Sequence, residues 1–214
     1  MPLSLEIHFA SLSSQPAGAV LLLAGADFTL GATAKSYDEK CKGALSRAAH
    51  AAEFTAKGKG SIEVLAPTGI DTPRIVIASA SSIGKELDRL MLGGYLFQQA
   101  SARKGDAATI VTDVADAGAG GEALAVDIAM GAALRSYTFK KYRTRKGEEG
   151  DGEAAKSGLS RLVILTAKPD AAAKAFAARK AITDGVFLAR DLVNEPANAL
   201  GPVEFADRLT VLAE

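Results

Sequence analysis

The sequence predicts a three-layer α/β/α domain in which helices cover both faces of a mixed, largely parallel β-sheet. Short β-rich runs alternate with helical patterns along residues 1–168, as expected for a layered α/β domain. Residues 19–24 are apolar at every position, which is typical of a central strand buried on both faces. With 214 residues the chain is long enough to bury a large core. Its single cysteine, Cys41, excludes an internal disulfide.

Six segments carry strand patterns. In the first, Leu3, Leu5, Ile7 and Phe9 alternate with polar residues, a two-residue period that indicates one buried face. The other five are short apolar or β-branched runs bounded by turn residues, and they cover residues 19–24, 62–66, 74–78, 108–112 and 161–166.

Four helices are predicted from apolar residues spaced three and four apart, which places them on one face. Their stripes are Leu45, Ala48, Ala49 and Ala52; Leu87, Leu90, Met91, Gly94 and Phe97; Leu124, Ile128, Gly131 and Leu134; and Ala175, Ala178, Ile182, Gly185, Ala189 and Leu192. Pro196 ends the fourth helix, because proline disfavours helical geometry in the residue before it. A further helix begins near Pro202 and continues to the last residues without a stop signal, which we interpret as truncation.

Charge and hydropathy exclude several classes of partner. Twenty-five basic residues balance twenty-five acidic ones, so no net charge attracts nucleic acid or acidic lipid. The longest early apolar run, residues 19–24, is far shorter than the roughly 20 residues of a membrane-spanning helix. The first basic residue is Lys35, so the cationic start of a secretory signal is missing. We therefore expect a cytoplasmic protein that does not enter a membrane.

The segment from Asp184 to Asn198, DGVFLARDLVNEPAN, resembles the leucyl aminopeptidase family, in which such a segment links an N-terminal domain to the catalytic domain. Its continuation LGPVEFA, residues 200–206, is similar to the same family. So is GAALRSYTFKKY at residues 131–142, which fits the family pattern G-x-x-L-x-x-Y-x-F-x-x-Y. Residues 43–60 fit the family's early helix and loop, and in order and spacing the resemblance covers nearly the whole chain.

The resemblance implies a macro-like N-terminal domain at residues 1–168, a linking helix at 169–195 and the start of the catalytic domain at 196–214. The family hydrolyses N-terminal residues, often leucine, from peptides, using two divalent metal ions, zinc or manganese, in the catalytic domain. The family's metal-binding signature N-T-D-A-E-G-R is absent from this chain. No catalytic, cofactor-binding or metal-binding residue is therefore assigned here. The chain is expected to be an inactive scaffold and assembly domain whose partners are its own catalytic domain and other subunits of a hexamer.

The residues expected to carry this role lie at the end of the linking helix. The polar side chains of Arg190, Asp191, Asn194 and Glu195 are predicted to fix the angle between two domains by hydrogen bonds. Two of them are four residues apart and so share a helix face. The set is Arg190, Asp191, Asn194, Glu195, Pro196 and Asn198.

Two alternative functions are suggested by other segments. The glycine-rich residues 118–121 lie between a strand and a helix, where backbone N–H groups can bind phosphate. Because macro domains in other proteins bind ADP-ribose, a nucleotide-binding module is one alternative, although Asp113 and Asp116 would repel a phosphate and no phosphate-binding motif is complete. Nucleic-acid binding is the other, through the basic residues Lys140, Lys141, Arg143, Arg145 and Lys146.

Candidate metal ligands are few. The acidic residues at 148–153 are interrupted by Gly150 and Gly152 and do not follow calcium-loop spacing; they predict a solvated loop. His8 and His50 lack the partner spacing of a zinc site.

Overall fold

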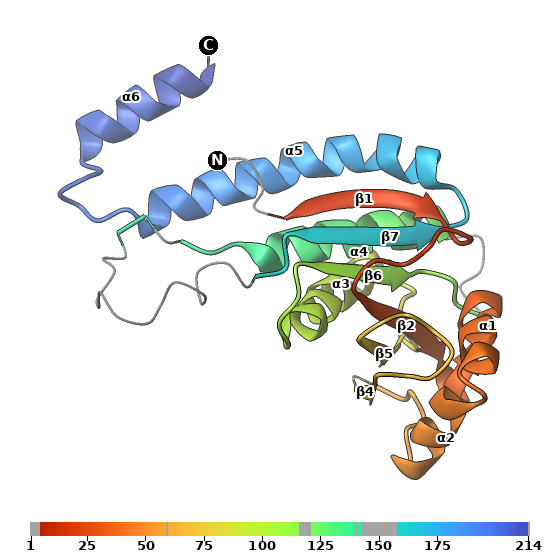
Figure 1. The fold of residues 1–214 in the computed structure, drawn as a ribbon. Helices are drawn as coiled ribbons and strands as arrows, with labels where there is room; N and C mark the ends of the chain where they lie inside the picture. The colour runs from red at the N-terminus through yellow and green to blue at the C-terminus, as the bar shows by residue number, and fades with distance from the viewer. Residues whose placement is uncertain (1–4, 59, 116–120, 140, 143–157, 214) are drawn as a thin grey trace, which may run out of the picture.

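A seven-stranded sheet forms the middle layer of the computed structural model, which describes residues 5–58, 60–115, 121–139, 141–142 and 158–213 (Figure 1). The strand order is β1-β7-β6-β2-β5-β4, and β3 pairs with β2. The strands β1, β7, β6, β2 and β5 are parallel neighbours, whereas β3 and β4 pair antiparallel. The strands are β1 (Glu6–Ser11), β2 (Ala19–Gly25), β3 (Thr29–Leu30), β4 (Ser61–Leu65), β5 (Arg74–Ser79), β6 (Ala107–Val111) and β7 (Arg161–Thr166). The expected mixed, largely parallel sheet is confirmed.

Helices cover both faces of this sheet. Side chains alternate along β2, so Leu21 and Leu23 enter the core beneath α3, α4 and α5, while Val20 and Leu22 enter the core beneath α1 and α2. Every residue of β2 is buried, as predicted for a central strand. The helices are α1 (Ala32–Lys40), α2 (Ala44–Ala51), α3 (Glu86–Ser101), α4 (Gly121–Ser136), α5 (Pro169–Asn194) and α6 (Pro202–Ala213).

Three elements differ from the sequence-based expectation. Strand β3, which is only two residues long, was not predicted. Strand β1 begins at Glu6; Leu3, the expected start, lies outside the described residues. Helix α1 was not predicted, because it buries only Ala34 and Tyr37 and so shows no apolar stripe.

Two of the predicted apolar stripes are confirmed, one is confirmed in part and one is wrong. Helix α2 buries Leu45 and Ala49, and α4 buries Leu124 and Ile128. Helix α3 packs Leu90 and Phe97 of the predicted stripe against the core but leaves Leu87 and Met91 exposed. Its buried residues are Leu92, Gly93, Leu96 and Ala100.

Helix α5 presents the predicted stripe outward. Its core contacts are Ala172, Phe176 and Thr183, whereas Ile182 is 51% exposed. The helix has two apolar sectors, and the one with the large aromatic side chain packs on the sheet, where Phe176 contacts Phe9 with 5.6 Å between ring centroids. Burying the larger apolar side chain removes more surface from water.

Helices α3 and α4 cross with their backbones in contact. A Cβ atom on Gly131 would lie 2.0 Å from the carbonyl oxygen of Leu90, and one on Gly93 would lie 2.3 Å from that of Ile128. In the described part of the chain, no helix is both long and apolar enough to cross a membrane.

Candidate functional site

The predicted linker residues lie where the last turns of α5 meet the segment that follows α4. Arg190 donates a hydrogen bond from Nη1 to the carbonyl oxygen of Leu134 at 2.7 Å. Its guanidinium carbon lies 5.4 Å from the centre of the Tyr137 ring, a cation–π distance. Arg190 therefore fastens the end of α5 to the end of α4.

Tyr137 is the centre of this contact. Its hydroxyl donates to Oδ1 of Asp191 at 2.8 Å and accepts from Nδ2 of Asn194 at 3.3 Å. Burial, followed by the bond to the Asp191 carboxylate, raises the pKa of Tyr137. The ring packs on Phe187 with 5.2 Å between centroids. Three of the six predicted residues, Arg190, Asp191 and Asn194, thus converge on one tyrosine.

Glu195 forms a second cluster one residue beyond the helix. Its side chain is 2% exposed and accepts hydrogen bonds from Nζ of Lys141, the hydroxyl of Tyr142 and Nη1 of Arg208, the last at 3.3 Å. These bonds, led by the one from Lys141, lower the pKa of Glu195 to about 2. Because Lys141 and Tyr142 follow α4 while Arg208 lies in α6, one carboxylate joins three segments.

Pro196 shapes the turn that follows α5, and neither it nor Asn198 joins these clusters. Glu195, the residue before the proline, is extended with φ −69° and ψ 135°, as proline requires, so α5 ends where the sequence predicted. The Pro196 carbonyl accepts the amide hydrogens of Ala199 and Leu200 at 2.9 and 3.0 Å. Asn198 is exposed.

Sequence reasoning missed the partners of the linker residues, namely Tyr137, Lys141, Tyr142 and Arg208. Three of them lie in residues 131–142, the segment that resembled the same family as the linker. That shared resemblance was the available signal that the two segments meet, but the pairing itself is a tertiary contact.

The contacts of Glu195 predict how the stability of the folded chain depends on pH. An ordinary glutamate titrates near pH 4.3, so the lowered pKa means that the cluster stabilises the folded state above that pH and loses this effect as the pH falls through about 2. In ¹³C NMR the Glu195 carboxyl should titrate near pH 2, and Lys141→Met should move the midpoint upward. As a control, Lys180→Met, which removes an ammonium 2.7 Å from Asp184, should leave the midpoint unchanged. A wild-type midpoint near 4.3 would contradict the prediction.

The alternative phosphate site before α4 is only partly described, because residues 116–120 lie outside the described residues. Asp113, one of the two carboxylates expected to repel a phosphate there, accepts the backbone amide hydrogen of Thr33 on Oδ2 at 2.6 Å, at the N-terminus of α1. The phosphate site at residues 118–121 stays a prediction.

The structure describes only one of the five basic residues in the stretch 140–146. Lys141 is paired with Glu195, whereas Lys140, Arg143, Arg145, Lys146 and the acidic residues of 148–153 lie outside the described residues.

No metal centre is formed by the residues that the structure describes, since no three His, Cys, Asp or Glu side chains gather there as ligands. His8 is exposed and lies 3.7 Å from Glu6, and His50 is exposed on α2. Cys41 is buried, and burial raises the pKa of its thiol.

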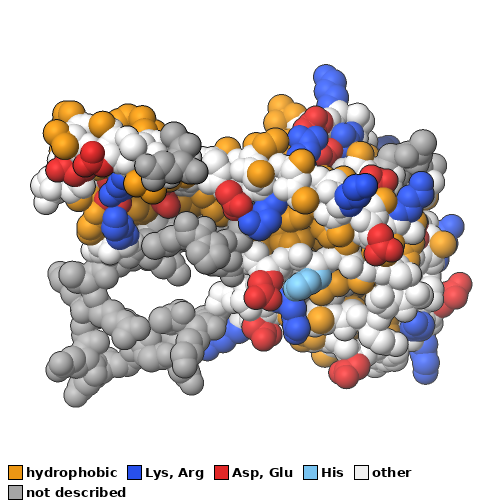
Figure 2. All heavy atoms as spheres, turned by 90° about the horizontal axis from the view of Figure 1, so that it is seen from above, with side chains coloured by type: hydrophobic (Ala, Val, Ile, Leu, Met, Phe, Trp, Pro, Cys, Tyr) orange, Lys and Arg blue, Asp and Glu red, His pale blue; other side chains and the backbone are white. Residues whose placement is uncertain are grey.

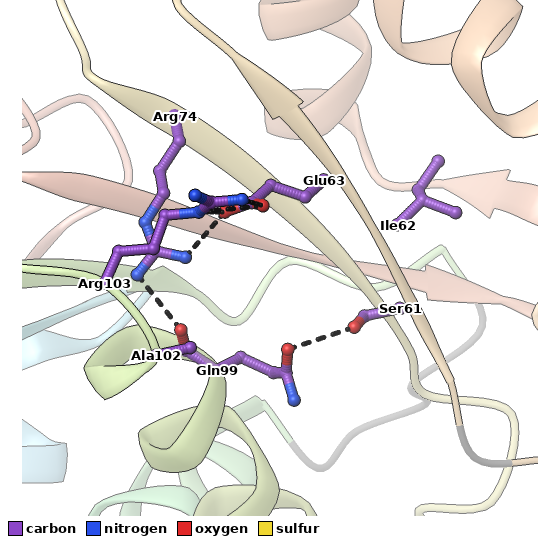
Figure 3. A pocket seen from close by; sticks show the side chains of 7 residues that line it. All are labelled: Ser61, Ile62, Glu63, Arg74, Gln99, Ala102 and Arg103. Atoms are coloured by element: carbon purple, nitrogen blue, oxygen red, sulfur yellow. Dashed lines mark hydrogen bonds and ion pairs between the residues drawn. The ribbon is translucent and has the colours of Figure 1, made fainter.

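A polar pocket of about 420 Å³ opens beside the edge strand β4 (Figure 3). Glu63 on β4 accepts hydrogen bonds from Nη1 of Arg74 at 2.8 Å and from Nη2 of Arg103 at 2.6 Å. Arg74, whose side chain is 6% exposed, also donates to the carbonyl oxygens of Gln99 and Ala100 at the end of α3. The bonds from Arg103 and Arg74 lower the pKa of Glu63. The polar groups of this pocket bind one another and join β4, β5 and α3.

Glu63→Gln should destabilise the domain by about 2–3 kcal/mol, because it leaves the buried Arg74 guanidinium without its counter-charge. Arg103→Gln should cost less than about 1 kcal/mol, since the Arg103 side chain is 53% exposed. Urea unfolding of both variants measures the difference. Equal losses would show that Arg74 does not depend on Glu63.

Comparison with known proteins identifies the class. Residues 19–146 match the family model described as the N-terminal domain of the cytosol aminopeptidase family, so the chain carries an aminopeptidase-type α/β domain. It is 41% identical over 99% of its length to a probable cytosol aminopeptidase of Rhizobium rhizogenes, and 39% identical over 96% of its length to one of Chelativorans. The chain belongs to the cytosol aminopeptidase family.

The chain spans only part of these relatives, namely 42% of the Rhizobium rhizogenes protein and 40% of the Chelativorans protein. Solved structures show the same fold. A mutant of tomato leucine aminopeptidase superposes with a TM-score of 0.76 at 21% identity, over 98% of this chain and 42% of that one. The bottromycin maturation enzyme BotP superposes with a TM-score of 0.60 at 21% identity, over 91% of this chain and 36% of that one.

Proposed function

We propose that this chain is the non-catalytic N-terminal part of a metal-dependent leucyl aminopeptidase. Its domain, residues 1–168, would serve as a scaffold, residues 169–195 as the link, and residues 196–214 as the first part of the catalytic domain. Nearly the whole chain aligns with 42% of a probable cytosol aminopeptidase, so most of that relative's length is a region that this chain does not match. The catalytic machinery is expected in that region.

The main observation in support of this proposal is the junction, the set of contacts that Glu195 makes at the end of α5. Helix α6 is exposed along most of its length, and Arg208 binds the Glu195 carboxylate, which also holds Lys141 and Tyr142. A nearly buried carboxylate with three donors sets the direction in which the chain leaves the domain. Such a contact suits a scaffold that must orient a neighbouring catalytic domain.

The remaining parts of the proposal come from the family. The whole protein would release N-terminal residues, often leucine, from peptides in the cytoplasm, as one subunit of a hexamer. Two zinc or manganese ions would polarise the scissile carbonyl and activate water. As in the family, both ions are expected in the catalytic region of the whole protein.

The test is an activity assay in two arms. The 214-residue chain, incubated with a leucine chromogenic substrate and Mn²⁺ or Zn²⁺, should give no turnover, while the protein encoded by the full reading frame should be active. In the full-length protein, Glu195→Gln should lower activity several-fold when assayed well below the unfolding temperature of the variant, and Lys180→Gln is the matched control. Chelator-sensitive activity in the 214-residue chain alone would overturn the proposal.

A further inference from the structure

Helix α5 carries a regular apolar seam on the side that faces away from the sheet. Its residues are spaced alternately three and four apart, which is the repeat of a helix-to-helix interface and not of a solvated surface. Ile182 at its centre is 51% exposed, and Figure 2 looks down on this side of the molecule. The α5 seam consists of Ala175, Ala178, Ile182, Gly185, Ala189 and Leu192.

The charged residues of the same stretch turn away from the seam. Arg179 binds Glu86 at 2.7 Å on the side of α3 and α4, and Arg190 reaches the end of α4. Lys180 and Asp184 bind each other at 2.7 Å. Lys174 is exposed at the beginning of this outward sector, but the six positions of the seam itself carry no charged side chain.

Gly185 is a second indication that another helix packs on this side of α5. A glycine within a helix costs about 0.5–1 kcal/mol relative to alanine. At Gly93 and Gly131 that cost has a structural reason, because another backbone lies within 3 Å of the Cβ position. At Gly185 no atom lies within 4 Å of that position. The domain itself gives no reason for this glycine, whereas the close approach of another helix would.

We propose that the α5 seam is the docking surface for a helix of the region that lies beyond residue 214 in the relatives; this inference rests on the proposed function. The chain covers 42% of the Rhizobium rhizogenes relative, so a region large enough to supply such a helix is available. Helix α6 lies above the C-terminal end of α5, on the side of α5 away from the sheet (Figure 1).

Further exposed apolar side chains lie at the end of α5 and on α6. Val193, at the end of α5, is 85% exposed. Helix α6 exposes Val203, Phe205, Leu209, Val211 and Leu212. A single domain that packs on α6 and extends back along α5 would cover both apolar surfaces. Since most residues of the seam are alanine or glycine, the docked helix would lie about 8 Å from α5, at the short end of the range for helix pairs.

Thiol labelling tests this docking. Ile182→Cys places a reactive thiol in the seam, and the native Cys41 is 1% exposed and does not compete. In the 214-residue chain the new thiol should react rapidly with a maleimide; in the protein encoded by the full reading frame its reaction should be at least tenfold slower. Ala173→Cys is the control, because Ala173 is exposed on α5 but lies off the seam, so it should react equally fast in both proteins.

The other outcomes are distinct. Equal labelling of Ile182→Cys in an active full-length protein overturns the docking inference and leaves the proposed function standing. If the Ile182→Cys thiol is already protected in the 214-residue chain, and the protection increases with protein concentration, the seam binds a second copy of the chain. That result also overturns the docking inference. A reading frame that ends at residue 214, or chelator-sensitive activity in the short chain, overturns the proposed function and this inference together.

Discussion

Replacing Gly131 with alanine should destabilise the domain by about 3 kcal/mol, the upper end of the usual cost of overpacking. The new Cβ would lie 2.0 Å from the Leu90 carbonyl oxygen and 3.1 Å from the Gly94 nitrogen. Both neighbours are backbone atoms of α3, so no side-chain rotation relieves the clash. The two helices must separate, and the interface between α3 and α4 lies directly over the main core.

The matched control is Gly185→Ala, the same substitution in another outer-layer helix. Because nothing lies within 4 Å of its Cβ position, this change should stabilise the 214-residue chain by about 0.5–1 kcal/mol through the higher helix propensity of alanine. Urea unfolding followed by circular dichroism measures both. A loss of stability in both variants would mean that the cost at Gly131 is not a contact effect.

Most of the sheet was predictable because every strand except the two-residue β3 carries its own local signal. The apolar run of β2 indicates burial on both faces, and its neighbours β5, β6 and β7 are short apolar runs between turn residues. The order of the strands was not predictable in this way, because β7 lies between β1 and β6 and the strand pairs are far apart in sequence. No local pattern encodes such a pairing.

Spacing alone could not decide which face of α5 is buried. The residues that face the core include the polar Thr183, whose hydroxyl bonds to the Arg179 carbonyl oxygen of its own helix, while the uninterrupted apolar seam faces outward. Local patterns were also insufficient at the junction. The family-like segment identified Glu195 as a linker residue, but it did not identify Arg208, 13 residues later, as the partner of Glu195.

Asp127→Ala should be the most destabilising single loss of a charge in the described structure, costing about 3–5 kcal/mol. The Asp127 side chain is 3% exposed, accepts from Nε of Arg89 at 2.7 Å and lies 3.6 Å from Nη2 of Arg179. Removing it leaves the Arg89 guanidinium, whose side chain is 18% exposed, without its counter-ion. Replacing both partners, as Asp127→Leu with Arg89→Met, should recover most of the loss, because buried ion pairs add little over apolar side chains of similar size. If the double variant is as unstable as the single one, packing and not charge is the cause.

The same variant separates the two places where α5 is held. Arg179 ties the middle of α5 to Asp127 on α4, whereas Tyr137 and Glu195 tie its end to the segment after α4. Hydrogen exchange in Asp127→Ala should therefore rise in residues 172–183, while the Glu195 carboxyl should still titrate near pH 2. A shift of that titration would mean that the two contacts act as one unit. An unchanged midpoint would mean that the junction keeps its geometry independently of how firmly the helix packs on the domain, as a link between two domains requires.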